Sequence, residues 1–282
     1  MDVQVSEPFE QIGYTGFMKA YCEYGGMLMN HGIELFGHRG ASGHYPENTL
    51  SAFEAAKRSG ADGIKFSVRM SKDHQLMVIH DESVNRTTNG SGIVRNMNYE
   101  ELKKLDAGSW FNGEFSNETI MTLHQVAEWA TQDGNRMRLN IELKNDSIDF
   151  VSLERAVLRL TRYYELENRV IISSFNPKSL MLVRALHPTI EIGYLVEGVP
   201  QNAVAKAKKI GASSIHCQEQ FALSSEGQKT LAAGLSLRVY PVNDKSRIEP
   251  FYQAGVSAVM TDFPDDFVKE YSLLVQSKRA VQ

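Results

Sequence analysis

Residues 34–68 read ELFGHRGASGHYPENTLSAFEAAKRSGADGIKFSV, and this stretch predicts a strand, a helix and a second strand. The β-like runs are 34–39 and 63–68, and the helical pattern between them spans 49–59. Gly60 follows the helix at the position where a left-handed C-cap requires no Cβ. Two strands joined by a helix form a parallel pair, so the stretch indicates an α/β fold.

The same alternation continues through the chain. Six more β-like runs follow, at 138–143, 169–175, 191–196, 213–217, 236–242 and 257–262. Further helical patterns lie at 122–132, 147–164, 177–187, 200–210, 224–233 and 246–254. Eight strands alternating with helices over roughly 250 residues predict a (β/α)8 barrel. A doubly wound dinucleotide-binding sheet is the weaker alternative, because Gly37, Gly40 and Gly43 follow the first strand at GxxGxxG rather than GxGxxG spacing.

One connection contains no helical pattern. Residues 63–82, GIKFSVRMSKDHQLMVIHDE, predict a β-hairpin. A two-residue turn at 73–74 places Ser67 opposite His80. The hairpin then stands over the carboxyl end of the barrel, which is the face where such barrels hold their active sites.

The composition is that of a folded soluble protein. Of 282 residues, 42% are hydrophobic and 23% charged, which suffices for a core and excludes a disordered or fibrous chain. The net charge of -4 gives no electrostatic sign of nucleic-acid binding or of an anionic membrane surface. No apolar run is long enough for a spanning helix, and MDVQVSEPFE lacks the basic start and apolar block of a secretory signal. With Cys22 and Cys217 as its two cysteines, the chain is expected to be cytoplasmic.

Two histidines are candidate acid–base groups. His38 and Arg39 end the first strand; a histidine titrates near neutral pH, and an arginine presents a planar fork to phosphate. His80 and Asp81 end the hairpin, which folds His80 over the barrel mouth. A His beside an Asp is also a common surface pair, and the hairpin geometry is what favours a functional role. Two histidines facing one cleft can serve as general base and general acid.

The predicted strand at 138–143 places two charged side chains on one face. Glu142 and Lys144 are two residues apart in NIELK, so their side chains share a face. Buried charges require partners, which favours a functional role for this pair. The last two strands end in polar pairs that are explained more simply as polar lining or helix caps, Asn243-Asp244 and Thr261-Asp262.

An ordered set of motifs runs through the chain: HRG (38–40), PENTLSAFEAAKRSGADGI (46–64), VIHDESVNRTTNGSG (78–92), LDAGSWF (105–111), NIELK (140–144) and TD (261–262). This set resembles the glycerophosphodiester phosphodiesterase family over about residues 34–270. The resemblance implies a TIM barrel with a small insertion after the hairpin, at about 81–120. It also implies hydrolysis of glycerophosphodiesters, such as glycerophosphocholine, to sn-glycerol 3-phosphate and an alcohol, with two histidines and a divalent cation.

The resemblance also implies a role for each motif residue. His38 and His80 resemble the general acid/base pair, Arg39 a phosphate contact, Glu142 a metal ligand, and Lys144 a charge partner of the phosphate. In the PENT motif, Glu47 resembles a polar residue lining the mouth. The RTTNGSG segment shows only the turn chemistry of the insertion.

The second strand departs from the family pattern. The family carries Glu-x-Asp there, two carboxylates that bind Mg²⁺ or Ca²⁺ together with the later glutamate; here Lys65 and Ser67 stand at those positions. A hard cation requires oxygen ligands and is repelled by an ammonium, so we expect the cation to be absent or weakly bound. The charges of Glu142, Lys144 and Lys65 sum to -1 + 1 + 1 = +1. The pocket is therefore expected to attract a phosphodiester without the metal.

Three functions are consistent with these residues. The first is a phosphodiesterase that is impaired or metal-independent, or that uses neighbours such as Glu47 as substitute ligands. The second is a non-catalytic protein that binds glycerophosphodiester or glycerol phosphate, and the third is an altered version of an active enzyme. The predicted organisation is an N-terminal arm (1–33), a barrel (34–275) and a C-terminal tail (276–282).

Overall fold

Nine strands form one sheet in the computed structural model, which describes residues 32–145 and 152–280. The predicted arm therefore lies outside the described residues, apart from its last two positions. The strands are β1 (Glu34–His38), β2 (Gly63–Met70), β3 (Leu76–Val78), β4 (Arg138–Leu143), β5 (Val170–Ser174), β6 (Glu191–Leu195), β7 (Ser214–Cys217), β8 (Ser236–Val239) and β9 (Ala258–Thr261).

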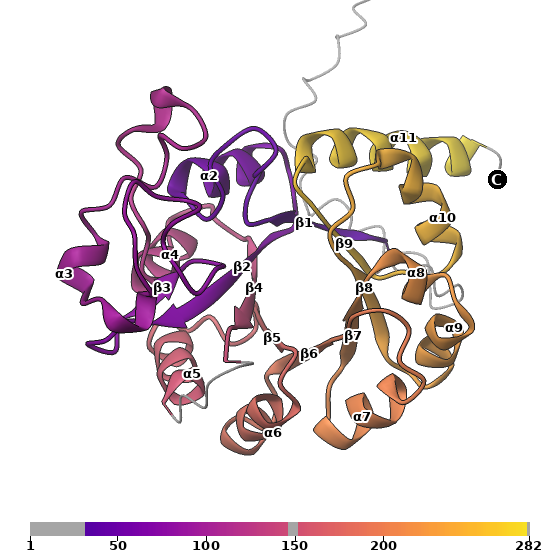
Figure 1. Ribbon diagram of the computed structural model, residues 1–282. Coiled ribbons are helices and arrows are strands. Elements are labelled where there is room, and N and C mark those ends of the chain that lie inside the picture. The colour runs from indigo at the N-terminus through magenta and orange to yellow at the C-terminus, as the bar shows by residue number, and fades with distance from the viewer. Residues whose placement is uncertain (1–31, 146–151, 281–282) are drawn as a thin grey trace, which may run out of the picture. The chain divides into compact units, whose positions relative to one another are not determined.

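The sheet closes on itself. Its order is β1-β9-β8-β7-β6-β5-β4-β2-β3, and β1 pairs in parallel with both β9 and β2. Only β3 is antiparallel to its neighbour, so the other eight strands form a parallel barrel with β3 outside the ring (Figure 1). The predicted (β/α)8 barrel is confirmed, and the doubly wound alternative is wrong because β1 lies next to the last strand.

Helices surround this barrel in Figure 1. They are α2 (Leu50–Arg58), α3 (Tyr99–Leu102), α4 (Leu123–Ala130), α5 (Leu153–Tyr163), α6 (Pro177–Leu186), α7 (Ala203–Ile210), α8 (Glu219–Ala222), α9 (Ser225–Ala232), α10 (Ile248–Gln253) and α11 (Pro264–Ala280). Short 3₁₀ turns lie at Val94–Asn96, Gly113–Phe115 and Lys245–Arg247. No helix of the described residues is both long and apolar enough to cross a membrane.

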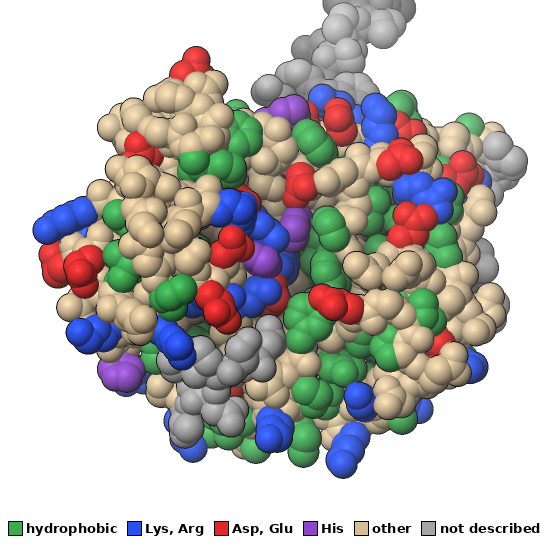
Figure 2. Space-filling model, in the orientation of Figure 1, with side chains coloured by type: hydrophobic (Ala, Val, Ile, Leu, Met, Phe, Trp, Pro, Cys, Tyr) green, Lys and Arg blue, Asp and Glu red, His purple; other side chains and the backbone are tan. Residues whose placement is uncertain are grey.

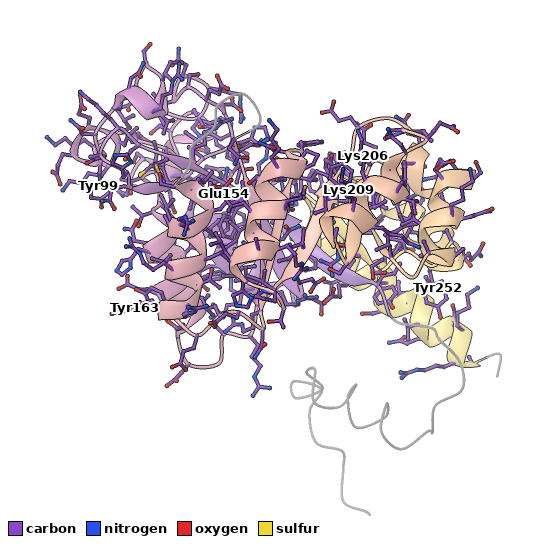
Figure 3. All side chains as sticks on the ribbon, turned by 90° about the horizontal axis from the view of Figure 1, so that it is seen from below. Tyr99, Glu154, Tyr163, Lys206, Lys209 and Tyr252 are labelled. Carbon is purple, nitrogen blue, oxygen red and sulfur yellow. The ribbon has the colours of Figure 1, made fainter. Side chains whose placement is uncertain are left out.

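Local sequence signals explain where the helices begin and how they pack. The Thr49 hydroxyl accepts the Ala52 N–H at the start of α2, and Thr122 and Gln125 form a capping box at the start of α4. Helix α7 buries Ala203, Ala207 and Ile210, whereas Lys206 and Lys209 lie on its outer side (Figure 3). This alternation at helical spacing covers the barrel with apolar side chains.

One further helix closes the described part of the chain. Residues 264–280 form α11, the longest helix of the described residues, which runs across the predicted boundary between the barrel (34–275) and the tail (276–282). Only Pro264 and Phe267 of this helix are buried, so its apolar periodicity is weak.

The hairpin register also differs from the prediction. Val68 pairs with Val78 and Met70 with Leu76, so the residue opposite Ser67 is Ile79, whose N–H donates to the Ser67 carbonyl. His80 was expected there, one residue further on. The turn contains three residues rather than two, because His74 adopts a left-handed conformation (φ 64°) at its end.

The insertion after the hairpin has a core of its own. Seven buried apolar residues from β3 and the insertion form a separate cluster: Met77, Ile79, Val84, Val94, Leu102, Ala107 and Ile120. Its backbone is also held internally, since Val84 N–H donates to the Gly92 carbonyl and Val94 N–H to the Glu82 carbonyl. The insertion is therefore a small packed unit beside the carboxyl end of β2.

Candidate functional site

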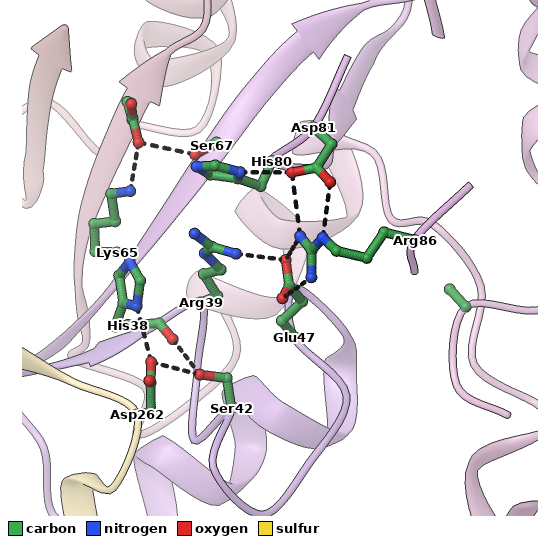
Figure 4. A network of polar contacts seen from close by, with 12 residues as sticks. His38, Arg39, Ser42, Glu47, Lys65, Ser67, His80, Asp81, Arg86 and Asp262 are labelled. Atoms are coloured by element: carbon green, nitrogen blue, oxygen red, sulfur yellow. Dashed lines mark hydrogen bonds and ion pairs between the residues drawn. The ribbon is translucent and has the colours of Figure 1, made fainter. Parts of the chain in front are cut away.

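The strands β1, β2, β4 and β9 end at one face of the barrel, where their polar side chains meet. Figure 2 shows a hollow in this face with histidine, basic and acidic side chains gathered around it. Figure 4 shows His38 and Arg39 from the end of β1, Lys65 from β2 and His80 from beyond β3 gathered in one network of polar contacts. The structure therefore brings together the two histidines that sequence analysis singled out.

His38, at the end of β1, is held from behind by Asp262. The His38 Nδ1 lies 2.8 Å from Asp262 Oδ1, and the same carboxylate accepts from Ser42 Oγ (2.8 Å) and Asn243 Nδ2 (2.6 Å). Burial raises the pKa of Asp262, but these donors outweigh it and lower the pKa to about 2. An ionised carboxylate only accepts, so His38 carries its proton on Nδ1 and leaves Nε2 for another partner.

Burial lowers the pKa of His38. The hydrogen bond to Asp262 raises this pKa, whereas the nearby positive charges of Lys65 and Arg39 lower it further. The ring is therefore neutral at neutral pH. A neutral imidazole with a free Nε2 can accept a proton.

His80 follows β3 and has a matching arrangement. Its Nδ1 lies 2.8 Å from Asp81 Oδ1, and Arg86 Nε donates to the other oxygen of that carboxylate at 2.7 Å. Burial lowers the pKa of His80 to about 4, helped by the positive charges of Arg39 and Lys144. His80 is thus a second neutral imidazole whose Nδ1 is committed to a carboxylate.

A buried ion cluster lies beside the histidines, centred on Glu142 of β4. Oε2 of this carboxylate accepts from the Lys65 ammonium and, at 2.9 Å, from Ser67 Oγ; Oε1 lies 2.7 Å from Lys144 Nζ. Burial raises the pKa of Glu142, but Lys65 and Lys144 outweigh it and hold the pKa well below its usual range. Burial lowers the pKa of Lys65, which Glu142 opposes.

Arg39 sits where the backbone leaves β1. Its φ is 62°, and this left-handed conformation is held by two hydrogen bonds, from Arg39 N–H to the Lys65 carbonyl (2.6 Å) and from Asn48 N–H to the Arg39 carbonyl (2.9 Å). The side chain donates from Nη1 to Glu47 Oε1 at 2.8 Å. Among the described residues its buried Nε has no hydrogen-bond partner. A buried donor without a partner favours an anionic ligand at this position.

The residues around Glu142 do not fit the divalent cation that the family resemblance implies. Both oxygens of Glu142 are engaged by ammonium groups, and the second-strand positions carry Lys65 and Ser67. Glu47 is no substitute ligand, because its two oxygens face the guanidinium groups of Arg39 and Arg86. Within residues 32–145 and 152–280, no three His, Cys, Asp or Glu side chains converge to hold a metal ion.

Sequence analysis assigned no role in this network to Asp262, Ser42 or Arg86. Asp262, which was explained more simply as polar lining or a cap, also holds His38 through its carboxylate. Its position at the end of the last barrel strand was the available signal. For Asp244 the capping explanation is right, since its carboxylate accepts from Ser246 N–H. Arg86 lies in RTTNGSG, a segment that its asparagine and glycine residues led us to interpret only as a turn, although the arginine contacts Asp81.

Comparison with known proteins agrees with this fold. Residues 38–266 match the glycerophosphoryl diester phosphodiesterase family. The chain is 41% identical over 238 residues to a glycerophosphodiester phosphodiesterase of Bacillus altitudinis, covering 84% of this chain and 97% of that protein. It is 37% identical over 234 residues to a glycerophosphodiester phosphodiesterase of Caldanaerobacter subterraneus, covering 83% and 96%.

A solved structure has the same fold. The Oleispira antarctica phosphodiesterase in complex with the product sn-glycerol-3-phosphate superimposes with a TM-score of 0.78 at 30% identity, covering 85% of this chain and 96% of that one.

Proposed function

We propose that this chain, which belongs to the glycerophosphoryl diester phosphodiesterase family and is by family a phosphoric diester hydrolase, hydrolyses glycerophosphodiesters without a bound divalent cation. The products are sn-glycerol 3-phosphate and an alcohol. The observation that carries the proposal is the ion cluster around Glu142, in which the Lys65 ammonium pairs with the buried carboxylate that resembles a metal ligand of the family.

The phosphate is bound by cations of the chain itself. Arg39 offers its unpartnered Nε, and Lys144 and Lys65 place two ammonium groups around one carboxylate. These three positive charges against Glu142 leave an excess that suits a phosphodiester anion. Glu47 orients Arg39 and does not itself contact the phosphate, because a carboxylate repels it.

The two histidines supply proton transfer. One Nε2 takes a proton from the attacking water, whose oxygen bonds to phosphorus, and the other gives a proton to the alcohol oxygen as its bond to phosphorus breaks. Both rings are neutral in the free protein, and a bound anion raises the pKa of each, so that one of them becomes protonated when the substrate arrives. Asp262 and Asp81 stabilise the imidazolium form.

Lys65 replaces only part of what a metal supplies. A divalent cation polarises a phosphoryl oxygen and orients the substrate, which together contribute several kcal/mol. The loss of these effects lowers the rate about 10³-fold. We therefore expect slow turnover that is indifferent to chelators.

A second candidate function is binding without turnover. It is favoured by the two ion pairs of Glu142, because a carboxylate that is paired with two ammonium groups cannot bind the divalent cation that the family resemblance implies. The ligand would again be a glycerophosphodiester or sn-glycerol 3-phosphate. We keep the cytoplasmic location as a prediction from sequence.

The test is release of sn-glycerol 3-phosphate from glycerophosphocholine, in EDTA and then with Mg²⁺ or Ca²⁺. It compares the unaltered chain with the double variant Lys65→Glu plus Ser67→Asp. Both side chains contact one oxygen of Glu142, so the variant gathers three carboxylates at one point. Lys206→Glu, on the exposed side of α7, controls for the reversal of one lysine charge.

Each outcome decides between the candidates. Slow release in EDTA by the unaltered chain and by the Lys206 control, with metal-dependent release by the double variant, supports metal-independent hydrolysis. Release by the double variant alone, together with calorimetric binding of sn-glycerol 3-phosphate by the unaltered chain, supports the binding function. Metal-dependent release by the unaltered chain contradicts both.

A further inference from the structure

Arg86, at the start of the RTTNGSG segment, connects two parts of the site that lie far apart in sequence. One edge of its guanidinium faces Asp81, with Nε to Oδ2 at 2.7 Å and Nη2 to Oδ1 at 3.2 Å. The other edge faces Glu47, with Nη1 to Oε2 and Nη2 to Oε1, both at 2.8 Å. Arg86 therefore pairs with both oxygens of each carboxylate (Figure 4).

Each of these carboxylates holds a group that faces the pocket. Asp81 accepts from His80 Nδ1, and Glu47 accepts from Arg39 Nη1, each at 2.8 Å. The result is an alternating chain of charges that runs from Arg39 through Glu47 and Arg86 to Asp81, which in turn holds the neutral His80 ring. The hydrogen bonds to Arg86 hold the pKa of Asp81 well below its usual range, so this carboxylate stays an acceptor.

We propose that Arg86 is a positioning residue that fixes the His80 imidazole and the Arg39 guanidinium relative to each other by bridging Asp81 and Glu47. The inference rests on the proposed function, since it concerns the geometry of that site. It makes the insertion part of the site, although Arg86 itself touches neither histidine.

A purely structural role explains the geometry less well. A single partly exposed ion pair contributes little stability, and Arg86 is 44% exposed. The insertion is already held by its own apolar cluster and by backbone hydrogen bonds such as Val84 to Gly92. Four donor contacts to two carboxylates instead specify orientation, which a planar guanidinium does better than an ammonium.

The experiment compares Arg86→Ala, Arg86→Lys and Arg95→Ala in the full chain. Arg95 is an exposed arginine of the same insertion and serves as the matched control. The primary measurement is nitrogen-15 NMR of the histidine rings at neutral pH, which reports the tautomer of His80 whether or not the chain turns over substrate. Thermal unfolding checks that each variant is folded.

We expect the unaltered chain and Arg95→Ala to show His80 protonated on Nδ1 alone. In Arg86→Ala, Asp81 is free to rotate and His80 populates both tautomers; Arg86→Lys lies between, because an ammonium keeps the charge and loses the fork. Where turnover is measurable, Arg86→Ala lowers kcat about 100-fold. It also raises KM for the diester through the loss of Arg39 orientation.

A double-variant cycle with Asp81→Asn separates positioning from general destabilisation. If Arg86 acts on kcat or on the tautomer through Asp81, the two effects are strongly non-additive. An Arg86→Ala protein that is folded and keeps the single Nδ1 tautomer overturns the inference, whatever its stability. Absence of turnover in every variant counts against the proposed hydrolysis and leaves the tautomer result decisive for Arg86.

Discussion

The two ends of the barrel both carry charged side chains, but the charges are used differently. At the amino-terminal floor, Arg138 lies 2.6 Å from Glu34 and also pairs with Glu191, which in turn pairs with Arg238. At the mouth, His38, His80 and Arg39 are each held by a carboxylate at one nitrogen and keep another nitrogen for a ligand. The floor is closed by ion pairs between its own side chains, although Nε and Nη1 of the buried Arg238 have no hydrogen-bond partner among the described residues. The mouth, by contrast, has the arrangement that we propose for binding an anion.

Strand β1 shows this difference between the two ends along one of its faces. Glu34 lies at the floor, Phe36 in the middle and His38 at the mouth, at the two-residue spacing of a strand. Phe36 belongs to a buried apolar cluster with Ile171, Ala258 and Met260, which separates the charged ends. Changes at one end are therefore expected to leave the other end intact.

The largest effect is expected from the mouth histidines. His38→Asn retains a donor for Asp262 but removes the ring nitrogen that moves the proton, so turnover of glycerophosphocholine should fall about 10³-fold. The same holds for His80→Asn. Circular dichroism should show both variants folded. Unchanged turnover in either variant would mean that the chemistry does not use that histidine.

At the floor, Arg238→Met is expected to affect stability alone. It leaves Glu191, which is partly exposed and still pairs with Arg138, with one partner fewer, and losing such a hydrogen bond costs about 1–3 kcal/mol of unfolding free energy. The measurement is chemical denaturation, accompanied by calorimetric binding of sn-glycerol 3-phosphate. A tenfold loss of affinity in the folded variant would contradict the separation of the two ends.

Ser67→Ala should have a smaller effect at the mouth. It removes a hydrogen bond to the buried Glu142 carboxylate, which costs about 2 kcal/mol of unfolding free energy. Ser277→Ala, at an exposed position of α11, is the matched control and should change stability little. Equal unfolding free energies for the two variants would show that Lys65 and Lys144 alone satisfy Glu142.

The smallest effects concern the change of stability with pH, which is expected to have opposite signs for groups at the two ends. Folding lowers the pKa of His80 from its ordinary value of 6.5 to about 4. Between these two pH values the unfolded chain therefore binds more protons than the folded chain. The contribution of His80 to stability is complete above pH 6.5 and is lost as the pH falls toward 4. Burial raises the pKa of Asp62, at the floor, from 3.8 to about 6, helped by Glu34. Its contribution is complete below pH 3.8 and is lost as the pH rises through 6.

Denaturation curves between pH 4 and pH 7 test these signs. Relative to the unaltered chain, His80→Asn should show a weaker rise of stability with pH, and Asp62→Asn a steeper one. Slopes that change in the same direction for both variants would contradict the assigned pKa shifts.

The strand and helix pattern was predictable because each βα unit carries its own local signals. The eight barrel strands lie within a few residues of their predicted positions, and Gly60 adopts the expected left-handed conformation (φ 83°). The hairpin register was predicted wrongly by one residue, because the number of residues in the turn depends on whether His74 adopts a left-handed backbone conformation. Helix α11 was missed because few of its residues are buried.

The sequence by itself determined the barrel, the family and the pair of histidines, because strand alternation, helix caps and ordered motifs are local properties of the chain. Only the tertiary structure decided which partner each group has. Asp262 is 224 residues from His38, Glu142 is 77 from Lys65, and Arg86 is 39 from Glu47. Such pairs form only when the barrel closes, because burial makes each charge depend on its nearest neighbours in space.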